Sequence, residues 1–170
     1  MGDFFLLDSS ALIKLYERVP TPARAVMWEI LGKAPESCQI MLCRSSTVVD
    51  TFFQIRKMRD RGKISAEEFD KSWEHFHDFV SRPDILNEYL TKEQLMLTSI
   101  DFIEKYNITY YPHCLILCCA IDKAVECGER FDEFTFVSCN RKLIEIAESA
   151  GVVCLNPNDF GDVTHEDALP

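Results

Sequence analysis

The chain has 170 residues, a usual length for one domain, and its 47% hydrophobic and 27% charged residues can fill a hydrophobic core. No apolar run is long enough to cross a membrane, and the first ten residues lack the basic region of a signal peptide, so we expect a cytoplasmic protein. The net charge of −10 argues against broad binding to polyanions. A nucleic-acid function would therefore need a local basic patch or bound cations.

The N-terminal segment predicts a buried strand followed by two helices. Phe4–Leu7 is a short apolar run typical of a buried strand. Asp8 and the serines after it are good N-caps, and they predict a helix through Glu17. The range Thr21–Gly32 predicts a second helix, with Pro22 near its first position, where proline fits best.

The next segment repeats this order of strand and helices. Gln39–Cys43 is the second predicted strand, and Ser45–Thr47 after it offer N-caps for a third helix. Ser65 and Glu68 form a capping box, in which each side chain accepts from the other residue's backbone N–H. This box predicts a fourth helix that ends near Val80.

The second half alternates in the same way. Its predicted strands are Ile85–Leu90, Phe134–Val137 and Val152–Leu155. Its predicted helices cover 91–106, 113–128 and 140–150. Their starts carry Thr91 with Gln94, Pro112 and Asn140, and the last helix is followed by Gly151.

Strands that alternate with helices predict an α/β fold, a three-layer sandwich with a central, mostly parallel β-sheet flanked by helices. We expect a single domain over residues 1–156 and a frayed acidic tail over 157–170. Ligands of such sheets bind at the carboxyl ends of the strands. The positions to inspect for chemistry are therefore Asp8, Arg44–Ser46 and Cys139–Asn140.

Several common catalytic motifs are absent from the sequence. The six glycines form neither a dinucleotide-binding pattern nor a P-loop, and there is no nucleophile elbow. A phosphotransferase aspartate at Asp8 would need an acid two residues later, where the chain has Ser10. The eight cysteines form no Cys-x-x-Cys pair, so we interpret them as small buried hydrophobic residues.

Three blocks of the sequence together resemble a known family. The first is LLDSSALIKLYE, with Asp8 after an apolar strand and Lys14 a little further on. The second runs from SSTVVDTFF through a basic stretch to a capped helix, and the third is FTFVSCNRKLIEIAESAGVVCLNPNDF. In this order and spacing they resemble the PIN-domain family, especially the VapC-type toxin ribonucleases, over nearly the whole chain.

The resemblance implies a site of about four carboxylates that hold Mg²⁺ or Mn²⁺ at the strand ends. A bound ion of this kind can activate water against a phosphodiester. The four family positions fall on Asp8, Asp50, His113 and Asn140, so two of the four acids are replaced. Asp8 and Asp50 are the expected metal ligands, and an imidazole beside them favours Mn²⁺ over Mg²⁺.

One stretch of this acidic chain is rich in positive charge, and we interpret it as the phosphate-contact patch. With two cations beside Asn140, the candidate RNA-binding residues are Arg56, Lys57, Arg59, Arg61, Lys63, Arg141 and Lys142. The alternative interpretation is a solvated helix end whose charges complement the helix dipole.

Two functions follow from the resemblance. The first is a metal-dependent endoribonuclease of the toxin type. The second is an inactive PIN-like module that binds RNA or a protein partner, with its pocket closed by an internal hydrogen bond such as Asn140 to Asp8. The resemblance also implies a homodimer and a possible cognate antitoxin.

Overall fold

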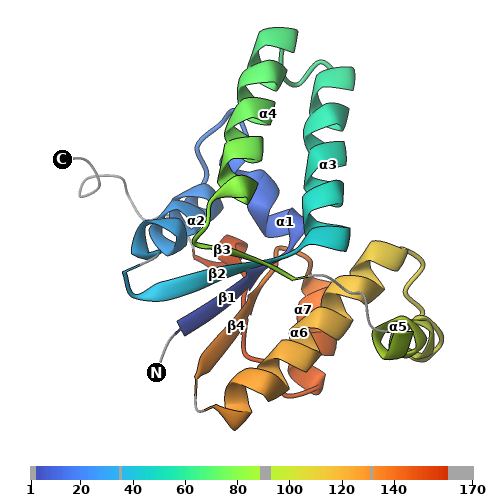
Figure 1. Ribbon diagram of the computed structural model, residues 1–170. Coiled ribbons are helices and arrows are strands. Elements are labelled where there is room, and N and C mark those ends of the chain that lie inside the picture. Colours follow the sequence, from blue (N-terminus) through green and yellow to red (C-terminus); the bar gives the residue numbers. More distant parts are fainter. Residues whose placement is uncertain (1–2, 35, 89–92, 131, 161–170) are drawn as a thin grey trace.

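The computed structural model describes residues 3–34, 36–88, 93–130 and 132–160. They form a five-stranded, all-parallel sheet in the order β3-β2-β1-β4-β5. The strands are β1 (Asp3–Leu7), β2 (Cys38–Cys43), β3 (Ile85–Glu88), β4 (Glu133–Val137) and β5 (Cys154–Leu155). The predicted three-layer α/β sandwich is confirmed (Figure 1).

Helices cover both faces of this sheet (Figure 1). The first four are α1 (Ser9–Leu12), α2 (Pro22–Lys33), α3 (Val49–Asp60) and α4 (Ala66–Ser81). The last three are α5 (Glu93–Tyr106), α6 (Tyr111–Glu129) and α7 (Arg141–Ser149). Short turns of other types are η1 (Ile13–Tyr16), η2 (Arg44–Val48) and η3 (Pro157–Asp159).

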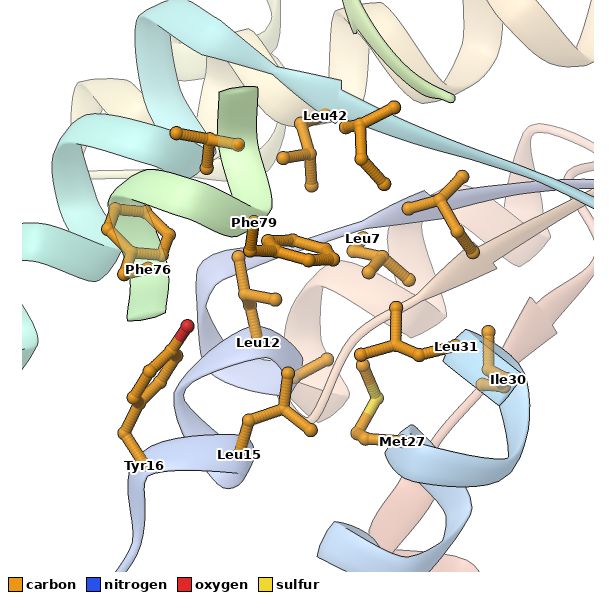
Figure 2. Packing of buried hydrophobic residues seen from close by; sticks show 14 of the residues in the cluster. Leu7, Leu12, Leu15, Tyr16, Met27, Ile30, Leu31, Leu42, Phe76 and Phe79 are labelled. Atoms are coloured by element: carbon orange, nitrogen blue, oxygen red, sulfur yellow. The ribbon is translucent and has the colours of Figure 1, made fainter. Parts of the chain in front are cut away.

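Two hydrophobic cores lie on opposite faces of the sheet because successive strand residues point to opposite sides. Leu7 packs in the core under α1, α2 and α4, whereas its neighbour Leu6 packs in the core under α6 and α7. Figure 2 shows the first core, in which Phe76 and Phe79 of α4 lie close to Leu12. Burial of each such side chain contributes roughly 1.5–3 kcal/mol.

The cysteines are part of these cores. Six of the eight are buried, and two are half-buried. Burial raises the pKa of the Cys118 thiol to about 12, so it stays protonated at neutral pH. This agrees with their interpretation as small hydrophobic residues.

The predicted elements occur with shifted ends. The helix expected after Asp8 is α-helical only to Leu12 and continues as the tighter 3₁₀ turn η1. The last strand begins at Cys154 rather than Val152, because the Val152 N–H bonds the Ala147 carbonyl at the end of α7. Part of the expected strand Ile85–Leu90 and the box residue Thr91 lie outside the described residues.

The N-caps predicted at Ser45–Thr47 are wrong. This segment belongs to η2, a π-helical turn that runs directly into α3 without a side-chain cap. Thr47 donates instead to the Leu7 carbonyl at 3.0 Å, which ties the turn to the end of β1. The caps predicted at Asp8, at the Ser65–Glu68 box and at Asn140 are confirmed.

The C-terminal segment was expected to be frayed from residue 157. Pro157–Asp159 form the 3₁₀ turn η3, in which Pro157 is buried, and η3 contacts α2. Residues 161–170 lie outside the described part of the chain.

Candidate functional site at the strand ends

The strand order reverses beside β1. The chain proceeds from β1 through β2 to β3 on one side and then returns to β4 on the other side of β1. In open α/β sheets, ligands bind where the strand order reverses in this way. Leu7 pairs with Val137, so the residues after β1 and after β4 leave the sheet at the same edge.

Asp8 occupies this switch point. It follows β1 directly, has 3% of its surface exposed and is the N-cap of α1. Its Oδ2 accepts from the Ser10 backbone N–H at 3.3 Å and from the Ser10 hydroxyl at 2.5 Å. It also accepts from the Ser138 hydroxyl, 2.9 Å away and 130 positions later in the chain. Hydrogen bonds that end on Asp8 therefore join the end of β1 to the end of β4.

The two serine hydroxyls also fix the connection that follows β4. The Ser10 hydroxyl accepts from the Cys139 backbone N–H at 2.9 Å, and the Ser138 hydroxyl accepts from the Asn140 N–H at 3.1 Å. Each hydroxyl thus donates to a carboxylate and accepts from the backbone. Such fully satisfied polar networks hold one geometry, because an unpaired buried member would be costly.

Asp50 lies next to Asp8, as predicted for an acid in the helix after the second strand. It has 5% of its surface exposed and sits in the first turn of α3. The Ser9 hydroxyl donates to Asp50 Oδ2 at 2.5 Å and lies 3.4 Å from Asp8 Oδ1. The Ser9 hydroxyl therefore lies between the two acids, which we call the carboxylate pair.

The second donor to Asp50 is Tyr110, at the start of α6. Its hydroxyl donates to Asp50 Oδ1 at 2.6 Å. This hydrogen bond, together with burial and the negative charge of Asp50, raises the pKa of Tyr110 to about 12. Each oxygen of Asp50 thus has a hydroxyl donor from the protein itself.

The other two predicted site residues have different roles. The His113 ring packs edge-on against Tyr110, with centroids 4.8 Å apart. The Asn140 side chain accepts from the Leu143 N–H at 3.4 Å and caps α7. Asp8 accepts from Ser10 and Ser138 rather than from Asn140, the partner suggested by the sequence.

The residues present do not fit the metal centre that the resemblance implies. Mg²⁺ and Mn²⁺ prefer several oxygen ligands directed at one point. In the described ranges, no three His, Cys, Asp or Glu side chains come together in a way that could hold a metal ion. Asp8 and Asp50, the two acids that lie beside each other here, both already accept from hydroxyls of the protein.

Four residues of this site were missed by sequence reasoning: Ser9, Ser10, Ser138 and Tyr110. Ser138 directly follows β4, and Ser9 follows Asp8, the first residue after β1. Inspection of every polar residue at the strand ends would have identified both. Tyr110 precedes α6, where no periodic pattern marks it. Its approach to Asp50 depends on how α6 packs against the sheet.

The predicted RNA-binding residues do not form one patch. Arg56 and Arg59 lie beside Asp60, at 3.8 and 2.9 Å, and Arg59 also stacks 4.4 Å above the Phe69 ring. Lys57, Arg61 and Lys63 line a pocket on a different side of α3.

The remaining two predicted cations are held elsewhere. Arg141 lies 3.4 Å from Asp159, and Lys142 donates to the Asn107 carbonyl at 3.1 Å. Neither lines the pocket of Lys57, Arg61 and Lys63.

Comparisons with known proteins add no relative: no family model matches the chain, and no match was found among curated proteins. Within the described ranges, none of the helices is both long and apolar enough to span a bilayer.

Proposed function

We propose that this chain is a PIN-like domain that binds RNA without metal-dependent cleavage. The observation that carries the proposal is the hydrogen bonding of the carboxylate pair. Asp8 accepts from Ser10 and Ser138, and Asp50 accepts from Ser9 and Tyr110. Neutral donors of the protein thus bind the carboxylate oxygens that would face a cation in a nuclease of this type.

The cost of binding an ion here follows from these contacts. A divalent cation would have to displace or reorient short hydroxyl hydrogen bonds, and hydrogen bonds to a charged group each contribute about 1.5–3 kcal/mol. The ion would gain two carboxylates in return, where the resemblance implies about four. Asn140 is already used as a helix cap, and His113 contacts Tyr110 through its ring.

RNA is supported by the resemblance and by the gathering of cations at the C-terminal end of α3. Lys57, Arg61 and Lys63 stand together on one pocket in a chain whose net charge is −10. Clustered Lys and Arg side chains bind phosphates largely by releasing counterions. A homodimer and an antitoxin partner remain proposals that rest on the resemblance alone.

The convergence of Asp8 and Asp50 favours a second candidate, an Mn²⁺-dependent endoribonuclease. Both acids are buried at the topological switch point, and one hydroxyl lies within hydrogen-bonding distance of both. Two carboxylates with bound waters and substrate phosphates can hold a divalent ion in some enzymes.

Calorimetry separates the two candidates. Mn²⁺ and Mg²⁺ are titrated into the wild-type chain and into Asp8→Asn, which retains a good N-cap residue. Binding of labelled single-stranded RNA is measured in parallel in EDTA. We expect no ion binding at millimolar concentration and RNA binding that EDTA does not change. Stoichiometric Mn²⁺ binding that Asp8→Asn abolishes would overturn the proposal in favour of the nuclease.

A further inference from the structure

The pocket that Lys57, Arg61 and Lys63 line has a volume of about 500 Å³. That size lies within the range of small-molecule sites, which is about 300–1,000 Å³. It lies between α3, η1 and the connection from η1 to α2. We call it the basic pocket, and its lining residues are Ile13, Glu17, Arg18, Val19, Thr21, Gln54, Lys57, Met58, Arg61 and Lys63.

We propose that the basic pocket binds backbone phosphates of single-stranded RNA, an assignment that rests on the proposed RNA-binding function. The first support is its charge. Four cations line it, and its one acid, Glu17, is paired with Lys14 at 2.8 Å. Arg18 lies 3.9 Å from Glu68, an exposed contact of little strength.

Among the described residues, the other three cations have no acid paired with them. Across the residues that the structure describes, no carboxylate lies within ion-pairing distance of Lys57, Arg61 or Lys63. All three side chains belong to exposed residues. Like charges gathered without partners repel one another, so a bound anion would relieve this repulsion.

The position of the pocket relative to the carboxylate pair is the second support. Ser9 contacts Asp50. Ile13 lies four residues after Ser9, Gln54 lies four residues after Asp50, and both line the pocket. Figure 1 shows α3 leaving the sheet beside α1. At 1.5 Å per residue, Lys57 lies about 10 Å along α3 from Asp50. A single strand of a few nucleotides could therefore extend from the strand ends to the pocket.

The chemistry of the walls favours RNA over an acidic protein segment. An extended peptide would add to an exposed strand edge, and no strand residue lines this pocket. Its walls combine long cationic side chains with the apolar groups of Ile13, Val19 and Met58. Phosphates that alternate with flat, apolar base faces match such a surface.

The test compares two double variants at the C-terminal end of α3 that remove the same charge. Lys57→Gln with Arg61→Gln alters the pocket, and Arg56→Gln with Arg59→Gln alters the side that faces Asp60 and Phe69. Fluorescence anisotropy follows a labelled oligouridylate of roughly 12 nucleotides, within the usual site sizes of single-strand binding domains. Thermal melts verify that both variants fold.

The pocket variant should bind about tenfold more weakly at roughly 0.1 M salt, and its salt slope should fall by about 1.4, or about 0.7 per lost phosphate contact. The control variant should change affinity less than about twofold. Equal losses in both variants would overturn the pocket assignment while leaving RNA binding intact.

Two further outcomes complete the test. If the wild-type chain does not bind RNA at all, the proposed function fails together with the pocket assignment. Polyglutamate of matched charge serves as the competing probe. If polyglutamate binds the wild-type chain as tightly as RNA does, and the pocket variant loses this binding, the pocket is a site for acidic protein segments and the RNA assignment is overturned.

Discussion

Tyr110 donates its hydroxyl to Asp50 across 60 positions of sequence, at 2.6 Å. This bond joins the start of α6 to the first turn of α3, two helices that lie in the layers on opposite faces of the sheet. The hydroxyl is a donor only while it is protonated. The link between the layers therefore depends on the protonation of one phenol.

The pKa of Tyr110 gives a direct test of this bond. A folded-state pKa of about 12, against the ordinary value near 10, means that folding favours the protonated form. Its contribution to stability is fully present below pH 10 and is lost as the pH rises toward 12. Absorbance titrations are recorded for the wild type and for Tyr110→Phe, and the difference between the two curves should show one tyrosine that ionises near pH 12. A difference curve centred near pH 10 would contradict the bond.

Ser138→Ala tests the hydrogen-bond network around Asp8. The change removes one donor to the carboxylate and leaves the Asn140 N–H without its acceptor, at a residue with no exposed surface. We expect the free energy of unfolding in urea to fall by about 2–3 kcal/mol. The control is Ser37→Ala, whose exposed hydroxyl donates only to the Lys33 carbonyl, and which should cost less than about 0.5 kcal/mol.

Restoring the two missing acids tests why the site does not fit a metal. Asn140→Asp keeps a residue that caps α7 well, and His113→Asp adds an acid in the first turn of α6, where negative charge is favourable. The double variant should bind Mn²⁺ by calorimetry and melt at a higher temperature with Mn²⁺ than without it. Wild type should show neither effect. An inert double variant would mean that these positions do not converge on the carboxylate pair.

The layered fold could be predicted from the sequence because helix and strand patterns depend on residues that are close together in the chain. Short apolar runs between capped helices predicted the parallel sheet, and the neighbours Leu6 and Leu7 do face different cores. Asp8 was placed at a strand end by the strand pattern and Asp50 was added by the resemblance, and the structure brings the two together.

The remaining features depend on contacts between distant segments. Ser138 and Tyr110 become donors only after β4 and α6 pack beside β1 and α3, and no local pattern contains that information. The basic stretch was treated as one patch because sequence proximity does not tell which side of a helix a residue faces. Asp60 and Phe69 take Arg56 and Arg59 away from the pocket.

The π-helical turn Arg44–Val48 sets the rotational phase of everything that follows it on α3. A π turn accommodates one residue more than an α turn, and each residue rotates the chain by about 100° around the helix axis. Without that extra residue, Asp50 would point away from Ser9, and Lys57 with Arg61 would turn away from η1. A single wide turn thus aligns both the acidic and the basic ends of this surface.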